Sequence, residues 1–192
     1  ACNPAYLETA DIVNAYMEKV NAKIGTSYKP FNYYGAPDAE EIIVAMGSVC
    51  DAAEEVVDYL NARGHKVGIV EVHLYRPFSQ KYLLNVMPKS VKKIAVLDRT
   101  KEPGGMGEPL YLDILAALRG TDFDQCFVCG GRYGLGSKDT QPGDILAVYE
   151  NLWSDAPKKE FTISITDDVT GLSLTPSCNP DVAPAGTKAC KF

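Results

Sequence analysis

The sequence lacks three features that would narrow its function at once: a long apolar run, an excess of basic residues and a signal-peptide-like start. No apolar run approaches the roughly 18–20 residues that a membrane-spanning helix needs, so no membrane partner is expected. The 192 residues carry 19 basic and 25 acidic side chains, a formal net charge of −6, and no basic stripe for nucleic acid. The first 20 residues contain Glu8, Asp11 and Glu18 and no apolar signal-peptide core, so a cytoplasmic location is expected.

Cysteine is present, but not in a pattern that favours disulfides. The six cysteines are spread along a chain that is 46% hydrophobic, which is enough to build a core without covalent cross-links. We therefore predict mostly reduced thiols, as in cytosolic proteins. Cys178 and Cys190 share one polar tail and would meet only if that tail folded back.

The sequence does contain a regular alternation of short apolar runs and amphipathic segments. Apolar runs such as Glu41–Met46 (EIIVAM) predict buried strands, and apolar residues at helical spacing predict helices. Strands are predicted at 41–46, 66–74, 91–97, 123–129 and 160–165, and helices at 8–23, 49–63, 79–86, 108–118 and 142–152. The pattern predicts an α/β fold with a mainly parallel sheet and helices on both faces.

Composition divides the chain into three parts. Residues 1–38 are predicted to form an N-terminal helix and a connecting loop rich in Tyr, Pro and Gly. Residues 39–165 hold the alternating segments and are predicted to form the α/β domain. Residues 166–192 contain three prolines and little periodicity, so we expect an extended tail that is the truncated start of a further domain.

Candidate contact residues follow the predicted strands. In parallel sheets, ligands and partners usually meet the carboxyl ends of the strands, where the connecting loops converge. The residues predicted to lie there are Gly47, Ser48, Arg76, Asp98, Arg99, Arg132 and Tyr133.

Each of these positions also has a local interpretation. Gly47-Ser48 joins a strand to a helix and serves either as a tight turn with a serine cap or as an anion site at the helix N-terminus. Asp98-Arg99 and Lys101-Glu102 are expected to form local ion pairs.

The glycine-rich segment 130–137 is the most function-like loop of the chain. Its four glycines permit unusual backbone angles and the close approach of another chain. Arg132 and Tyr133 are predicted to anchor a neighbouring domain. The alternative is that Arg132 contacts a phosphate or carboxylate.

Two further patterns resemble chemical sites but are predicted to be structural. Cys126 and Cys129 have CxxC spacing, yet they lie in a predicted strand, where positions i and i+3 point to opposite faces. With two histidines in the chain and no second CxxC, we expect small core residues and no metal or redox site. His73 is expected to be a partly buried, hydrogen-bonded side chain, since no catalytic partner can be named for it.

Four segments together resemble the pyruvate:ferredoxin oxidoreductase family of anaerobes: IVAMGSVCDAAEEVVDYL, VEVHLYRPFS, VKKIAVLDRTKEPGGMGEPLYLDILAAL and GGRYGLGSKDTQPGDILAVYENL. The flanking stretches YKPFNYYGAPDAE and FTISITDDVTGLSL are similar to the same family, so the resemblance covers nearly the whole chain. It implies an internal piece of such an enzyme, folded like the C-terminal domain of transketolases.

The resemblance implies an activity for the parent enzyme and a supporting role for this piece. The parent would oxidatively decarboxylate pyruvate with coenzyme A to acetyl-CoA and CO2 and reduce ferredoxin or flavodoxin. It would use thiamine diphosphate, Mg2+ and [4Fe–4S] clusters held by other domains, because this sequence has no CxxCxxCxxxCP run. We therefore expect no catalytic residue, metal or cofactor in this piece. Its partners would be neighbouring domains of the same polypeptide and the second subunit of a homodimer.

Two other functions remain open at the level of the sequence. One is a self-sufficient domain that binds an anion such as coenzyme A through Gly47-Ser48 and Arg132. The other is a thiol redox protein that uses Cys126 and Cys129.

Overall fold

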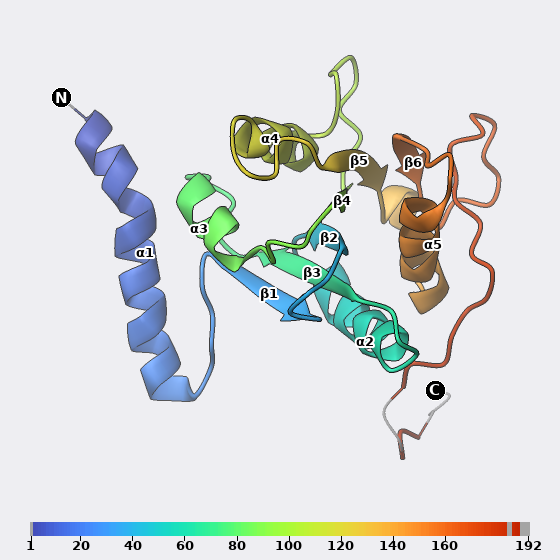
Figure 1. Cartoon of the computed structure of the whole chain (residues 1–192), viewed down its shortest axis with the longest axis horizontal. Coiled ribbons are helices and arrows are strands. Elements are labelled where there is room, and N and C mark those ends of the chain that lie inside the picture. Colours follow the sequence, from blue (N-terminus) through green and yellow to red (C-terminus); the bar gives the residue numbers. More distant parts are fainter. Residues whose placement is uncertain (1, 184–185, 189–192) are drawn as a thin grey trace.

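The computed structural model describes residues 2–183 and 186–188, which form one six-stranded sheet with helices around it (Figure 1). The strands are β1 (Phe31–Gly35), β2 (Glu41–Ala45), β3 (Val67–Val72), β4 (Lys93–Asp98), β5 (Phe127–Arg132) and β6 (Glu160–Thr162). Their order in the sheet is β1-β3-β2-β4-β5-β6, and within it β1 runs antiparallel to β3 while the other pairs are parallel. The predicted α/β class and mainly parallel sheet are confirmed.

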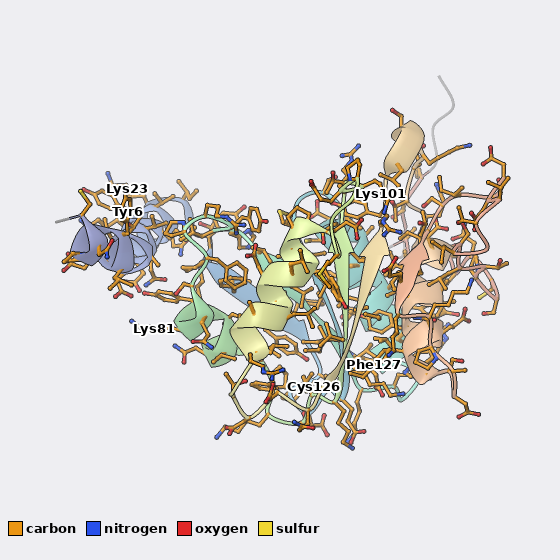
Figure 2. The ribbon with its side chains drawn as sticks, turned by 90° about the horizontal axis from the view of Figure 1, so that it is seen from above. Tyr6, Lys23, Lys81, Lys101, Cys126 and Phe127 are labelled. Atoms are coloured by element: carbon orange, nitrogen blue, oxygen red, sulfur yellow. The ribbon has the colours of Figure 1, made fainter. Side chains whose placement is uncertain are left out.

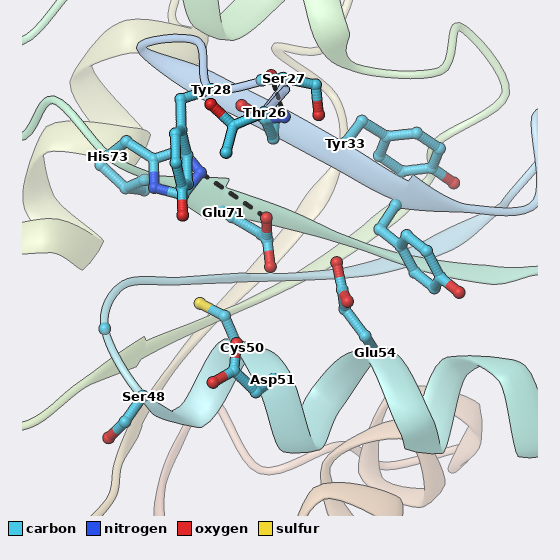
Figure 3. A pocket seen from close by; sticks show the side chains of 14 residues that line it. Thr26, Ser27, Tyr28, Tyr33, Ser48, Cys50, Asp51, Glu54, Glu71 and His73 are labelled. Atoms are coloured by element: carbon cyan, nitrogen blue, oxygen red, sulfur yellow. Dashed lines mark hydrogen bonds and ion pairs between the residues drawn. The ribbon is translucent and has the colours of Figure 1, made fainter. Parts of the chain in front are cut away.

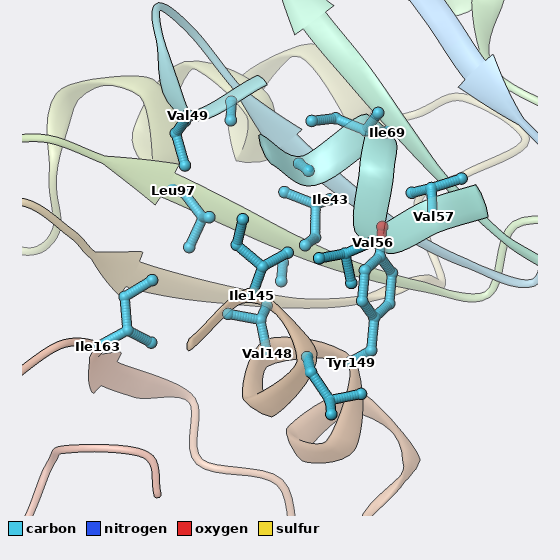
Figure 4. Close-up of a cluster of buried hydrophobic side chains, with 14 of the residues drawn as sticks. Ile43, Val49, Val56, Val57, Ile69, Leu97, Ile145, Val148, Tyr149 and Ile163 are labelled. Atoms are coloured by element: carbon cyan, nitrogen blue, oxygen red, sulfur yellow. The ribbon is translucent and has the colours of Figure 1, made fainter. Parts of the chain in front are cut away.

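Helices cover both faces of the sheet, as the apolar strands predict. The helices are α1 (Asn3–Ile24), α2 (Val49–Asn61), α3 (Gln80–Val86), α4 (Pro109–Leu118) and α5 (Pro142–Trp153), with a short 3-10 turn, η1 (Leu135–Ser137). Successive strand residues point to opposite faces, so Ile43 and Leu97 pack with α2 and α5 (Figure 4). Ile42 and Val96 pack with α3 and α4 on the other face.

Strand β1 corrects the prediction of a loop through residues 26–38. Its five residues, FNYYG, lack a continuous apolar run, and only Phe31 is fully buried. The strand forms because the outer edge of β3 offers free backbone groups, and Phe31 pairs there with Val72. That pairing joins segments far apart in the sequence, which the local pattern does not reveal.

Strand β5 lies further along the chain than the predicted strand at 123–129. Gly130, Gly131 and Arg132 belong to the strand, and the loop begins only at Tyr133. The glycines are required by close packing, because a Cβ on Gly131 would approach Phe161 Cε2 to 2.2 Å. Glycine here indicates crowding inside the sheet.

Helix α1 is longer than predicted and stands apart from the sheet beside α3 (Figures 1 and 2). Of its residues, only Ala10 is buried. The helix ends at Gly25, whose φ of +73° lies in the left-handed region that favours glycine. Within the described chain, no helix is long and apolar enough to cross a membrane.

The tail follows an extended path along the domain. Over 166–183 and 186–188 it forms no helix, and a single bridge joins Ser173 to Thr162. Leu174 and Val182 pack against the core cluster of α2 and α5. Asn179 Oδ1 accepts a hydrogen bond of 2.7 Å from the Gly143 amide at the start of α5.

Candidate site at the carboxyl edge of the sheet

The loops that leave β2, β4 and β5 meet at the carboxyl edge of the sheet around a hollow of about 150 Å³. Ser48, Arg99 and Tyr133, three of the predicted contact residues, line this hollow. They come together because parallel strands end at the same edge. Lys138, which no sequence motif singles out, adds a second basic side chain.

The Gly47-Ser48 turn sets the direction in which α2 leaves the sheet. Gly47 has a φ of +81°, a conformation that other residues adopt only with strain. Ser48 occupies the N-cap position of α2, but within the described residues its side chain makes no capping hydrogen bond. The hydroxyl is exposed at the edge, so the turn presents a polar group to whatever lies next to it.

Tyr133 and Arg99 occupy the same edge in different ways. Tyr133 is buried, and its hydroxyl donates a hydrogen bond of 2.9 Å to the Met46 carbonyl, which ties the end of β5 to the end of β2. Arg99 is exposed and passes over Gly134, where a Cβ would come within 2.9 Å of Arg99 Nε. Tyr133 therefore connects the loops that follow β2 and β5, whereas the charged side chain of Arg99 is exposed to solvent.

Asp98 is directed into the fold and away from the edge. It is 4% exposed, and its carboxylate accepts hydrogen bonds from the amides of Leu110 at 2.9 Å and Tyr111 at 3.1 Å. Burial raises the pKa of Asp98, although these two amides oppose the shift. The side chain thus satisfies the free amides at the start of α4.

The guanidinium group of Arg132 also forms its hydrogen bonds inside the domain. Its Nε donates to Glu108 Oε1 over 2.6 Å, and a second guanidinium nitrogen donates to Glu160 Oε2 over 3.3 Å. Burial opposes the charge, but the contacts with Glu108 and Glu160 raise the pKa of Arg132. Lys101 lies 3.8 Å from the same Glu108 oxygen, so the expected local pairing of Lys101 with Glu102 is corrected to Glu108.

Arg76 lies away from the hollow. It follows β3, forms an ion pair of 2.7 Å with Asp113 of α4, and stacks on Tyr75 with its guanidinium carbon 3.8 Å from the ring centre. The predicted residues therefore separate into three exposed residues at the carboxyl edge (Gly47, Ser48 and Arg99), three buried side chains (Asp98, Arg132 and Tyr133), and Arg76 on the α4 face.

A larger cavity of about 660 Å³ opens on the other side of the Gly47-Ser48 turn (Figure 3). Carboxylates from two elements converge on it: Asp51 and Glu54 from α2 and Glu71 from β3. His73 Nε2 lies 3.7 Å from Glu71 Oε2, and its side chain is 28% exposed; the histidine is partly buried as expected, but at this distance the expected hydrogen bond is not formed. The sequence does carry a signal for this cavity, since Glu71 and His73 share one face of an otherwise apolar strand.

The electrostatics of this cavity are acidic. Burial and the neighbouring negative charges raise the pKa of Glu54 and of Glu71. Burial lowers the pKa of His73, so the histidine contributes little positive charge at neutral pH. Burial, followed by the nearby carboxylates, also raises the pKa of Cys50 to about 12, which keeps it a neutral thiol. The arrangement suits a cationic group and offers no activated nucleophile.

Comparison with known proteins decides the family. The sequence pattern of the family described as Pyruvate:ferredoxin oxidoreductase core domain II matches residues 39–145. This chain belongs to that family. Within it, the chain is 52% identical along its full length to the pyruvate-flavodoxin oxidoreductase of Enterobacter agglomerans and 52% identical to the pyruvate:ferredoxin oxidoreductase of Moorella thermoacetica. The chain spans only 16% of the length of each of these relatives.

Among solved structures, a transketolase from Pichia stipitis matches 39% of this chain and 12% of its own length, with 26% identity and a TM-score of 0.31. An overlap this limited does not relate the two folds. The resemblance of core domain II to the C-terminal domain of transketolases therefore stays a prediction.

Cys126 and Cys129 of this core domain II chain have separate environments. Cys126 precedes β5 and its thiol donates to the Val91 carbonyl at 3.2 Å, whereas Cys129 is fully buried beside the Ile94 carbonyl. Burial raises the pKa of Cys129 to about 12 and also raises that of Cys126. Neither thiol is activated for redox chemistry.

The described side chains do not form a site for a metal ion or an iron–sulfur cluster. Over residues 2–183 and 186–188, no group of three or more His, Cys, Asp or Glu side chains is arranged to hold a metal ion. Cys190 lies outside the described residues.

Proposed function

We propose that this chain is a section of an enzyme that oxidatively decarboxylates pyruvate with coenzyme A to acetyl-CoA and CO2 and reduces ferredoxin or flavodoxin. The observation that carries the proposal is the 52% identity along the whole chain to two enzymes named for pyruvate and these electron acceptors. Thiamine diphosphate, Mg2+ and [4Fe–4S] clusters would be bound by other parts of the polypeptide. The enzyme would be a cytoplasmic homodimer.

Within that enzyme, we propose that this domain supports assembly and performs no catalysis alone. Asp98 and Arg132 are used to build the carboxyl edge, since their polar atoms bond inside the domain. Ser48, Arg99 and Lys138 are exposed at that edge and would contact a neighbouring domain.

The test uses the complete polypeptide with both basic side chains removed, Arg99→Ala together with Lys138→Ala. The expected result is faster proteolytic cleavage between domains and a fall in the rate of pyruvate oxidation of about tenfold. A tenfold loss corresponds to the removal of a docking contact worth about 1.4 kcal/mol. The matched control is Lys89→Ala with Arg119→Ala, which removes two exposed basic side chains near the opposite end of the strands. Identical behaviour of the two double variants would contradict the carboxyl-edge contact.

A second candidate function is binding of an anion such as coenzyme A at the same edge. Arg99 and Lys138 beside the N-terminus of α2 favour it, because basic side chains and a helix N-terminus attract negative charge, whereas Asp139, which lines the same hollow, opposes it. Calorimetry of the 192-residue chain with coenzyme A separates the two functions. Heat that disappears in Arg99→Ala would favour anion binding, and no heat at millimolar coenzyme A would rule it out.

A further inference from the structure

Helix α1 exposes an apolar face that nothing in the described chain covers. Ile12, Tyr16 and Val20 recur at helical spacing and are 51%, 62% and 47% exposed. With Val13 and Met17 they line a groove of about 410 Å³, here called the α1 groove. A contiguous row of exposed apolar side chains is typical of an interaction surface.

Hydrogen bonds of Asp11 and Asn21 hold helix α1 in place against the rest of the chain. The Asp11 carboxylate accepts hydrogen bonds from Lys81 Nζ at 2.8 Å and from the Tyr82 hydroxyl at 2.7 Å, both on α3. At its other end, Asn21 donates to the Tyr28 carbonyl and accepts from the Tyr28 amide. Figure 2 shows the helix held apart from the body of the domain, with the labelled Lys81 on the neighbouring α3. The groove is thus a formed feature of the fold.

The α1 groove continues into the acidic cavity. Tyr28 and His73 line both spaces, with their rings edge to face and 5.2 Å apart between centres. Beyond this pair lie the carboxylates of Asp51, Glu54 and Glu71. The combined surface is an apolar stripe that leads to a negatively charged pocket.

We infer that one segment of the remaining polypeptide occupies this surface, with apolar side chains against α1 and a Lys or Arg side chain among the three carboxylates. The inference rests on the proposed function, in which this chain is a section of a longer polypeptide. Charge complementarity selects the basic side chain, because three carboxylates face the pocket and His73 is the one basic residue among the described residues that line it.

Two observations favour the same polypeptide over a second copy of this chain. The relatives are far longer than this chain, which spans 16% of their length, so ample chain exists to supply the segment. A second copy would bring a net charge of −6 toward an acidic pocket, which like-charge repulsion opposes.

The experiment places the photo-crosslinker p-benzoylphenylalanine at position 16 of the complete polypeptide, in place of Tyr16. The expected product is one intramolecular crosslink to a peptide outside residues 1–192 that contains apolar residues and a Lys or Arg. The matched control places the crosslinker at Ala15, which is exposed but does not line the α1 groove, and should yield at least tenfold less. A covalent dimer of polypeptides, or equal yields at the two positions, would overturn the inference.

The acidic half of the surface is tested by charge removal in the same crosslinking assay. Glu54→Gln together with Glu71→Gln should lower the yield at position 16 at least threefold. Glu55→Gln, on the same helix but outside the cavity lining, should leave the yield unchanged. A yield that does not respond to the loss of both carboxylates would contradict the bound basic side chain.

The outcome is distinguishable from a failure of the proposed carboxyl-edge contact. Suppose that position 16 gives the expected crosslink, while the Arg99→Ala, Lys138→Ala double variant behaves like its control. That result would support the occupied α1 groove and contradict the carboxyl-edge contact. The reverse pattern would reject only the α1 groove.

Discussion

The Arg132 guanidinium donates to Glu108 over 2.6 Å, and the two side chains are only 6% and 4% exposed. This pair joins the end of β5 to the residue that precedes α4. A charged pair this deeply buried is compatible with a stable fold only while both partners are present. If one partner is removed, the other is a buried charge that neither water nor an opposite charge compensates. The carboxyl edge therefore depends on a contact between residues 24 positions apart.

The first prediction concerns removal of one partner of this buried pair. Arg132→Met should destabilise the chain by about 3 kcal/mol, since Glu108 would remain buried with only the longer contacts from Lys101 and the Glu102 amide. Urea unfolding measures the loss. Adding Glu108→Leu should restore part of the stability, and a double variant less stable than Arg132→Met would contradict this account.

An exposed ion pair supplies the control for that measurement. Lys92→Met breaks the pair with Glu40, in which the two side chains are 65% and 47% exposed. Its cost should stay within about 1 kcal/mol, as for exposed pairs generally.

The second prediction concerns the carboxylate that receives the first amides of α4. Asp98→Ala removes both acceptors for Leu110 and Tyr111 and leaves the amides unsatisfied. The expected cost is about 2 kcal/mol, at the upper end of the range for lost helix caps. Thermal unfolding measures it, with Asp124→Ala as an exposed control that should change stability little. Similar effects at both positions would be inconsistent with a capping role for Asp98.

The third prediction concerns thiol reactivity. In the native protein at pH 8, a thiol reagent should label the exposed Cys2 and Cys178 rapidly. Cys50 and Cys129 should react only after unfolding, because burial raises the pKa of each to about 12 and blocks access to the sulfur. Peptide mass spectrometry assigns the labels. Rapid labelling of Cys129 in the native protein would contradict this prediction and support a thiol redox function for Cys126 and Cys129.

The fourth prediction concerns pH and the carboxylates of the acidic cavity. Burial and the charge of Glu71 raise the pKa of Glu54 above its ordinary value of 4.5, so the folded state holds this proton more tightly than the unfolded chain. That contribution to stability is complete below pH 4.5 and is lost as the pH rises through the raised pKa. Glu54→Gln should therefore increase the melting temperature at pH 8 by about 2 °C and leave it unchanged at pH 4.

The exposed Glu55→Gln should show no such pH-dependent gain. A gain of equal size at pH 4 would mean that packing, and not ionisation, causes the effect of Glu54→Gln.

Strands β2, β3 and β4 were predictable because their side chains are buried on both faces of the sheet. The run EIIVAM places β2 to within one residue, since nearly all of its side chains pack into one of two cores. Strand β1 was not predictable in this way. Its tyrosines are partly exposed, and it exists because β3 has a free edge.

In the candidate site too, the positions of residues were predictable from the sequence, whereas the directions of their side chains were not. The positions of Ser48, Arg99 and Tyr133 after parallel strands predicted their meeting at one edge, and the structure brings them together. The sequence did not indicate that Asp98 and Arg132, at equivalent strand ends, turn inward. That direction depends on Glu108 and on the start of α4, which approach only after the sheet has formed.

By itself, the amino-acid sequence determined the alternation of strands and helices, the mainly parallel sheet and the family, because periodicity and long matching segments are local properties of the chain. The tertiary structure alone decided which polar side chains are used inside the domain and which face outward. It also created the acidic cavity from α2 and β3 and, within the part of the chain that the structure describes, left the apolar face of α1 exposed. Burial and pairing depend on side chains that are distant in sequence, so only the folded arrangement reveals them.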